Sequence, residues 1–303
     1  MRSKLFVPGS RPELFAKAFA SAADGISIDL EDAVAEARKP QARMAVKDWL
    51  QQHAHGMAEK TLIVRVNAQG TEHFEKDLHA VVSPGVQLIN LPKPESAQAV
   101  RAASAAIASA EAANGVATPV GLLLNIETPA ALRRAAELAC ADPRVVGLQL
   151  GLGDLFEPWG MDRAEHAAVV QAMFAVRMAA AEAGIYALDG AFADVADADG
   201  YRKEAELARR LGFIGKTCVH PKQVMLANDV FQPSASEIAY ALKVEAAAID
   251  ATARGLGAYM VEGRMVDAPF ARRAQAQLQH AHRLGLISTP ASAVDEQRPL
   301  SQS

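Results

Sequence analysis

Short apolar runs alternate with longer segments of helical periodicity along most of the chain. The runs are rich in Val, Ile and Leu and almost continuous in hydrophobicity, which is typical of parallel strands buried on both faces. Between them, as in residues 11–23 and 94–113, apolar side chains recur at intervals of three and four and predict amphipathic helices. The expected strands are residues 4–8, 25–30, 61–66, 86–92, 120–127, 145–154, 184–189 and 212–219.

Repetition of this strand and helix unit favours a closed barrel. Eight units of roughly 30 residues each match the (β/α)8 TIM barrel better than an open doubly wound sheet. No GxGxxG motif follows the first expected strand, which argues against a dinucleotide-binding fold. We therefore predict an α/β protein with the barrel over residues 1–232, a C-terminal helical cap or arm over 233–287, and a flexible, polar tail over 288–303.

Composition is that of an ordinary globular protein. Half of the 303 residues are hydrophobic, 22% are charged and the formal net charge is -4, so we expect no nucleic-acid partner. No apolar run approaches the roughly 18 residues that span a bilayer, and we expect no membrane association. Cys140 and Cys218 show neither metal-binding spacing nor a disulfide framework, which is compatible with a cytoplasmic location.

Polar side chains follow most of the expected strands. Barrel active sites lie at the C-terminal ends of the strands, whereas the strand starts here are mostly apolar, Gly or Pro. These end positions therefore form a candidate functional rim. They are Asp29, Glu31 and Asp32; Arg65 and Asn67; Lys93; Asn125 and Glu127; Asp154; Asp189; and Lys216 and His220.

Two of these carboxylates predict a metal site. In the stretch "GLLLNIETP", Thr128 and Pro129 have the chemistry of a helix start, which leaves Glu127 unexplained at the end of a buried strand. Asp154 ends the neighbouring strand, about 5 Å away, unless it caps the following turn. Since two such carboxylates repel each other, we expect a hard cation such as Mg²⁺ between them.

Arg65 ends a strand on the same rim. Its planar guanidinium could hold a substrate carboxylate through two hydrogen bonds, and it could equally form a structural ion pair with Glu31 or Asp32. The substrate predicted from these residues is an oxo or hydroxy acid that chelates the metal while Arg65 binds its acid group.

Several motifs resemble the citrate lyase β-subunit-like family of the HpcH/HpaI aldolase superfamily, which includes malyl-CoA and citramalyl-CoA lyases. The resemblance covers roughly residues 2–287, and the motifs occur in order along the chain. They are "LFVPGSRPELFAKAF", "DGISIDLEDAVAEARKPQAR", "VRVN", "LPKPES", "NIETPAAL", "LGLGDL", "LARRLGFIGKTCVHPKQV" and "VEGRMVDAPFARRA".

This resemblance implies a trimeric or hexameric barrel that binds Mg²⁺, with Mn²⁺ as a substitute, and acyl-CoA thioesters. It assigns Glu127 and Asp154 as metal ligands and Arg65 and Glu127 as substrate-contacting residues. Glu31 and Asp32 of the "DLED" motif would surround Arg65 and metal-bound water. Asp267 would be the catalytic acid or base that the C-terminal arm delivers to a neighbouring subunit.

The expected activity is Mg²⁺-dependent cleavage of a 3-hydroxyacyl-CoA, such as malyl-CoA, citramalyl-CoA or a citryl thioester. The products would be an acyl-CoA and a keto acid: pyruvate, glyoxylate or oxaloacetate. Lys93 and Lys216 are candidate contacts for CoA. Three alternatives stay open: a thioesterase on the same metal, a Schiff-base aldolase using Lys93 or Lys216, and a β subunit that acts only within a larger complex.

Overall fold

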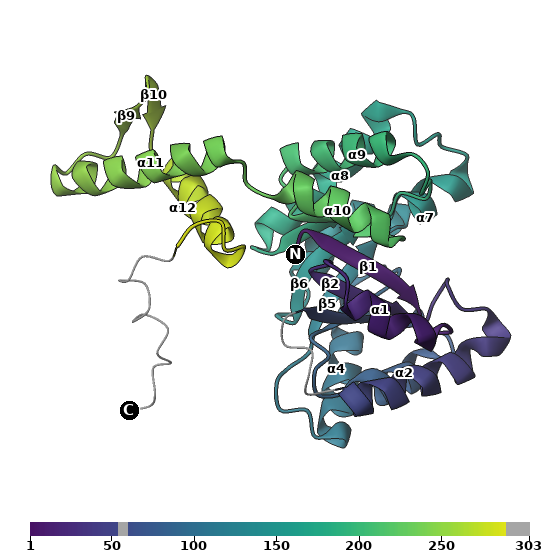
Figure 1. The fold of residues 1–303 in the computed structure, drawn as a ribbon. Coiled ribbons are helices and arrows are strands. Elements are labelled where there is room, and N and C mark those ends of the chain that lie inside the picture. Colours follow the sequence, from purple (N-terminus) through teal and green to yellow (C-terminus); the bar gives the residue numbers. More distant parts are fainter. Residues whose placement is uncertain (54–59, 289–303) are drawn as a thin grey trace, which may run out of the picture. The chain divides into compact units, whose positions relative to one another are not determined.

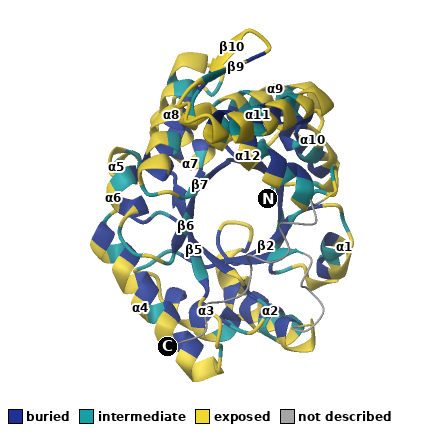
Figure 2. Cartoon of the chain, turned by 90° about the vertical axis from the view of Figure 1, so that its left-hand side faces the viewer, coloured by how far each residue is buried: buried dark blue, intermediate teal, exposed yellow. Residues whose placement is uncertain are grey.

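Eight parallel strands form a closed barrel in the order of the sequence. The computed structural model describes residues 1–53 and 60–288, and the chain divides into one compact unit from Met1 to Phe231 and a second that begins at Gln232. In the first unit a ring of buried strands is surrounded by helices whose outer faces are exposed (Figures 1 and 2). The TIM-barrel prediction is confirmed. The strands are β1 Ser3–Pro8, β2 Gly25–Asp29, β3 Thr61–Arg65, β4 Leu88–Leu91, β5 Gly121–Ile126, β6 Val145–Leu150, β7 Tyr186–Asp189 and β8 Gly215–Cys218.

Helices follow the strands, and some of them are capped by residues that the sequence supplies locally. For example, Ser96 accepts a hydrogen bond from the first turn of α4, and Gly115 ends that helix at φ 67°. The helices are α1 Phe15–Phe19, α2 Lys39–His53, α3 Phe74–Val81, α4 Ala97–Asn114, α5 Pro129–Arg133, α6 Ala135–Ala139, α7 Leu152–Phe156, α8 His166–Glu182, α9 Ala198–Arg210 and α10 Pro221–Phe231, with short 3-10 turns at Pro12–Leu14, Glu36–Arg38 and Glu157–Trp159.

Alternate residues of each strand face the helices or the interior of the barrel. On β3, Leu62 and Val64 belong to the main apolar core that the helices cover, whereas Arg65 reaches the interior. Polar residues of non-adjacent strands meet inside: Lys4 of β1 contacts Asn90 of β4. The barrel therefore has an apolar outer layer and a partly polar interior.

One expected strand is shorter than its apolar run. Residues 145–154 were expected to form a single strand, but β6 ends at Leu150, and Gly151 begins the short helix α7. The alternating leucines continue past the strand because Leu152 and Leu155 are buried on the helix instead. Asp154 consequently lies in the first turn of α7 rather than on a strand.

The second unit is helix, hairpin and helix, with a small apolar core of its own. Helix α11 (Ala235–Ala253) begins with a capping box made by Ser234 and Glu237. It is followed by β9 (Tyr259–Val261), β10 (Arg264–Val266) and α12 (Ala268–Arg283). The expected tail, apart from residue 288, lies outside the described residues. Across the described chain, we find no helix with the length and apolarity needed to cross a membrane.

Candidate active site at the mouth of the barrel

Arg65 is the centre of a buried ion-pair network. The β2–β3 register sets Asp29 directly beside it, and the Arg65 Nε and Nη2 donate to the two Asp29 carboxylate oxygens at 2.7 and 2.6 Å. The third nitrogen, Nη1, lies 2.8 Å from Glu31 and 3.5 Å from Asp32. Burial opposes both charges of the Arg65–Asp29 pair, but the paired hydrogen bonds lower the pKa of Asp29 and raise that of Arg65.

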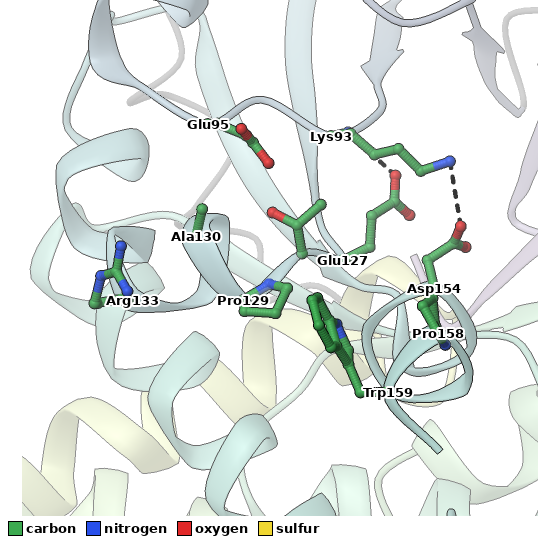
Figure 3. Close-up of a pocket in the computed structure, with 10 residues that line it drawn as sticks. Lys93, Glu95, Glu127, Pro129, Ala130, Arg133, Asp154, Pro158 and Trp159 are labelled. Atoms are coloured by element: carbon green, nitrogen blue, oxygen red, sulfur yellow. Dashed lines mark hydrogen bonds and ion pairs between the residues drawn. The ribbon is translucent and has the colours of Figure 1, made fainter. Parts of the chain in front are cut away.

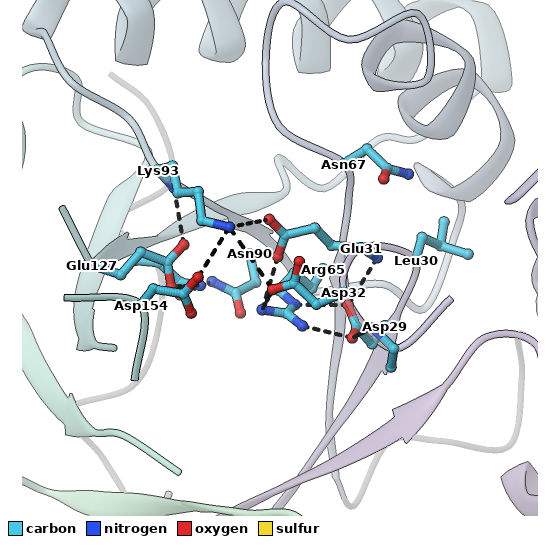
Figure 4. Close-up of polar contacts among 12 residues, drawn as sticks. Asp29, Leu30, Glu31, Asp32, Arg65, Asn67, Asn90, Lys93, Glu127 and Asp154 are labelled. Carbon is cyan, nitrogen blue, oxygen red and sulfur yellow. Dashed lines mark hydrogen bonds and ion pairs between the residues drawn. The ribbon is translucent and has the colours of Figure 1, made fainter. Parts of the chain in front are cut away.

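Lys93 connects this network to the predicted metal ligands. Its Nζ lies 3.2 Å from both Glu31 Oε1 and Asp154 Oδ1, and its backbone N–H donates to Glu127 Oε1 at 3.1 Å (Figure 4). Between two prolines, Lys93 has φ 50°, in the left-handed region that a residue with a side chain seldom occupies. Such backbone strain is typical of functional sites, and here it directs both donors of Lys93 at carboxylates.

Glu127 follows β5 directly and is 2% exposed. Asn125 Nδ2 donates to its second oxygen, Oε2, at 3.1 Å. A Cβ at Gly151 would lie 2.6 Å from Glu127 Cβ and 2.7 Å from Oε2, so only glycine leaves room for this carboxylate. Burial raises the pKa of Glu127 to about 7, and the nearby charges of Glu31 and Asp154 contribute to the increase.

A pocket opens beside Glu127 and Asp154 (Figure 3). As expected, Thr128 caps α5 by accepting from the Ala131 N–H, and Pro129 occupies the first turn. The helix start therefore does not use the Glu127 carboxylate. The cavity has a volume of about 520 Å³ and is lined by Lys93, Glu95, Glu127, Thr128, Pro129, Ala130, Arg133, Asp154, Pro158 and Trp159.

The charge balance of this cluster suits a divalent cation. Its acidic groups outnumber its bases, because Arg65 and Lys93 meet Asp29, Glu31, Asp32, Glu127 and Asp154. Burial also raises the pKa of Glu31 to about 7, so the interior favours either protons or further positive charge.

Oxygen donors decide which cation fits. Glu127 and Asp154 offer carboxylate oxygens only, and Mg²⁺ is commonly held by one or two carboxylates with water and substrate oxygens completing its shell. Over residues 1–53 and 60–288 no group of three or more His, Cys, Asp or Glu side chains has a metal-binding arrangement, so a His- or Cys-rich zinc site is not found there.

Lys216 lies elsewhere, contrary to its expected place on the rim. Its side chain is fully buried, and its Nζ is 2.6 Å from Asp189 and 2.9 Å from Glu204 of α9. Contact with a helix shows that Lys216 points out of the barrel toward the helical layer. A CoA contact or an imine at Lys216 is therefore not compatible with this arrangement.

Three polar residues inside the barrel were not singled out from the sequence. Lys4, Asn90 and Gln149 are buried, and Lys4 donates hydrogen bonds across the interior to the side-chain oxygens of Asn90 and Gln149. A signal was present in β1, where Lys4 and Phe6 alternate with apolar residues that face the helices. This signal was missed because a lysine near the start of a strand is usually exposed to solvent.

Asp267 lies at the start of α12 in the second unit. It occupies the N-cap position, where an aspartate normally accepts a hydrogen bond from the first turn, but its side chain makes no such bond. Its Oδ1 is buried and has no hydrogen-bond partner among the described residues. The local helix therefore does not account for this carboxylate.

Known proteins share both the sequence and the fold. The family model described as HpcH/HpaI aldolase/citrate lyase matches residues 2–221. Citrate lyase subunit beta of Haemophilus influenzae is 36% identical over 282 residues, covering 92% of this chain and 96% of the relative. L-malyl-CoA/beta-methylmalyl-CoA lyase of Rhodobacter capsulatus is 36% identical over 301 residues, covering 92% and 94%.

Solved structures resemble the chain over a similar length. CitE from Mycobacterium tuberculosis in complex with magnesium, acetoacetate and coenzyme A matches with a TM-score of 0.71 and 33% identity, covering 93% of this chain and 99% of that one. The citrate lyase beta subunit from the same organism, complexed with oxaloacetate and magnesium, has a TM-score of 0.63 and 34% identity, covering 77% and 97%.

Proposed function

The chain belongs to the HpcH/HpaI aldolase/citrate lyase family, and from this premise we propose that it is a Mg²⁺-dependent lyase for 3-hydroxyacyl-CoA thioesters. The relatives are named lyases, and the chain is therefore a lyase as well. The observation that carries the finer proposal is the convergence of Glu127 and Asp154 on Lys93 at one pocket beside Arg65.

We propose Glu127 and Asp154 as the ligands of Mg²⁺, with Mn²⁺ as a substitute. Magnesium is present in the related structures that also contain acetoacetate with coenzyme A, or oxaloacetate. When bound, the ion would supply Lewis-acid polarisation of the substrate oxygens.

Arg65 and Lys93 would bind the acid end of the substrate. Asp29 occupies the Nε and Nη2 edge of Arg65, so the substrate would meet Nη1 and compete with Glu31 there. Glu31 and Asp32 are thus positioning residues for the two cations. Pyruvate, glyoxylate and oxaloacetate are the candidate keto acids.

The reaction breaks one carbon–carbon bond and needs no covalent intermediate. A base would take the hydroxyl proton and pass it to solvent, and cleavage of the bond would give a keto acid and the enolate of an acyl-CoA. Asp267 would protonate the enolate carbon and regain a proton from solvent, so that one proton leaves and one enters in each turnover, or it would remove the carbon-bound proton in the condensation direction. Because its carboxylate is not used by its own helix, we propose that Asp267 acts in a neighbouring subunit of a trimer or hexamer.

Lys93 is a poor candidate for an imine-forming lysine. Burial lowers its pKa, but the charges of Glu31, Asp32 and Asp154 outweigh that effect and raise the pKa above its ordinary value. A protonated amine cannot attack a carbonyl group, so the proposal is metal-assisted cleavage rather than Schiff-base chemistry.

Incubation of the purified protein with Mg²⁺ and a panel of malyl-, citramalyl- and citryl-CoA tests the proposal. We expect one ester to yield a keto acid and an acyl-CoA, measured by trapping the keto acid and by chromatography of the thioesters. Glu127→Gln should lower the rate at least about 100-fold, because it removes a carboxylate ligand and leaves the side chain's shape unchanged.

Three outcomes would contradict the proposal. Release of free CoA without any keto acid would identify a thioesterase. Full activity in the presence of excess chelator, or in the Glu127→Gln variant, would remove the metal site from the mechanism. Requirement for added carrier and transferase subunits would instead indicate a β subunit that works only within a complex.

A further inference from the structure

A lysine lies completely buried inside the barrel. Lys4 Nζ donates to Asn90 Oδ1 at 2.9 Å and to Gln149 Oε1, and it lies 4.1 Å from the centre of the Phe6 ring. In the closed barrel β1 is adjacent to neither β4 nor β6, so these contacts cross the interior. Two amide oxygens and an aromatic face thus surround the amine, and within the described parts of the chain no carboxylate forms an ion pair with it.

Hydrogen bonds continue from Lys4 to the proposed metal site. Asn90 Nδ2 donates to Asn125 Oδ1 at 2.7 Å and to Leu123 O at 3.0 Å. Asn125 Nδ2 in turn donates to Glu127 Oε2 at 3.1 Å. The path from amine to carboxylate therefore contains two amide side chains, both of them fully buried.

The chemistry of the two ends fixes the direction of this path. A lysine ammonium can only donate, and a carboxylate can only accept. Each asparagine must then turn its oxygen toward Lys4 and its NH₂ toward Glu127, as the structure shows. Burial lowers the pKa of Lys4, but even a neutral amine has two N–H donors for its two amide partners.

We propose that Lys4 is a positioning residue for Glu127, which it orients through Asn90 and Asn125 so that the carboxylate is presented to the metal in one fixed rotamer. The inference rests on the proposed function, because it takes Glu127 as a Mg²⁺ ligand. Groups behind a metal ligand commonly change metal affinity by 10- to 100-fold, since they determine the orientation of the ligand.

Replacing the amine tests the proposal. Lys4→Met keeps the length of the side chain and removes its donors, so the Asn90 amide oxygen loses its donor and the amide is held less firmly. We expect the dissociation constant for Mg²⁺, measured by titration calorimetry on the metal-free protein, to rise about tenfold. At saturating Mg²⁺ the turnover number should change less than the Mg²⁺ requirement does, because Lys4 does not touch the substrate pocket.

Thr217→Val is the matched control. Thr217 is paired with Lys4 in the β1–β8 register, and its Oγ1 is buried without a hydrogen-bond partner among the described residues. The substitution is nearly isosteric and lies outside the path to Glu127, so Mg²⁺ binding should equal that of the unaltered protein. An equal loss in both variants would show general damage to the barrel interior and would overturn the proposal.

Asn90→Leu interrupts the same path at its middle and serves if Lys4→Met does not fold. It should weaken Mg²⁺ binding by a similar factor, and the double variant should be no weaker than the worse single one, because both changes break one path. Unchanged Mg²⁺ affinity in a folded Lys4→Met or Asn90→Leu variant refutes the role of Lys4.

Failure of the inference can be told from failure of the proposed function. The unaltered protein alone tests whether thioesters are cleaved with Mg²⁺. The comparison of Lys4→Met with Thr217→Val tests only how Glu127 is oriented. An unaltered protein that binds no Mg²⁺ would overturn both.

Discussion

At the mouth of the barrel, some carboxylates are buried, and the carboxylates together outnumber the basic groups that they contact. Glu31 and Glu127 are both buried, and the pKa of each is raised to about 7 from an ordinary value of 4.5. Below pH 7 each of these groups holds a proton, and an ion bound at the proposed ligand Glu127 would have to displace the proton held there. Proton and metal binding would therefore be linked at this site.

We expect Mg²⁺ affinity to fall about tenfold per pH unit below pH 7 for each proton displaced, because a protonated Glu127 cannot bind the ion. Titration calorimetry over about pH 5.5 to 8 would measure this dependence. In the Glu127→Gln variant the remaining affinity should lose most of its pH dependence. A flat profile in the unaltered protein would contradict the raised pKa.

The same shifts have the opposite effect on the metal-free fold. A carboxyl group with a higher pKa in the folded state binds more protons there than in the unfolded chain, so its contribution to stability is lost as pH rises from about 4.5 to about 7. With chelator present, the melting temperature should respond to pH in this direction, and added Mg²⁺ should raise it more at pH 8 than at pH 5.5.

Residue chemistry explains which site predictions were possible. Glu127, Asp154, Arg65 and Lys93 follow apolar runs, and that visible pattern places them near one another. The pairing of Asp29 with Arg65 was not foreseen, because it depends on register between strands that are far apart in sequence.

Among the secondary-structure elements, the turn from β6 into α7 determines how closely Glu127 can approach. A Cβ at Gly151, just before α7, would overlap the Glu127 side chain, whereas a Cβ at Gly153, within α7, meets nothing within 4 Å. Gly151 is therefore needed to leave space for the Glu127 side chain, whereas Gly153 is not.

We predict that Gly151→Ala weakens Mg²⁺ binding about tenfold, because the new methyl group displaces Glu127. Gly153→Ala should leave binding unchanged and can add helix stability, since alanine favours the helix more than glycine does. Calorimetric Mg²⁺ titration of the two variants would measure the contrast. Equal behaviour of both would show that Glu127 has room to move.

Strand parity explains the failed placement of Lys216. Neighbouring residues of β8 are all buried, so hydrophobicity does not reveal which of them face the helices. The contacts with Glu204 and Tyr201 of α9 show that Lys216 points outward. The same ambiguity hid Lys4, which points inward from a strand of mainly apolar residues.

For the whole molecule, the order of the strands was predictable from the sequence. Alternating apolar and helical segments were sufficient to predict the barrel, and the matched motifs identified the family correctly. The role of Asp267 concerns a second chain and stays a prediction.

Mixing two inactive variants would test that role. We expect Asp267→Asn and Glu127→Gln to be inactive alone and to regain about a quarter of normal activity when co-assembled in equal amounts. A site that takes one residue from each of two chains has an even chance of each being intact. Activity of co-purified mixed oligomers measures this, and no recovery would place both residues in the same chain.

The position of Lys93 affects the charge at the mouth of the barrel when no metal ion is bound. Its ammonium stands among the carboxylates as a tethered counter-ion, so the mouth of the barrel is never left with its acids facing only one another. At the proposed metal site, loading would then be an exchange between a cation carried by the chain and one taken from solution. Such a site would give up its ion more readily than bare carboxylates would, because the ammonium balances part of the negative charge that the ion leaves behind.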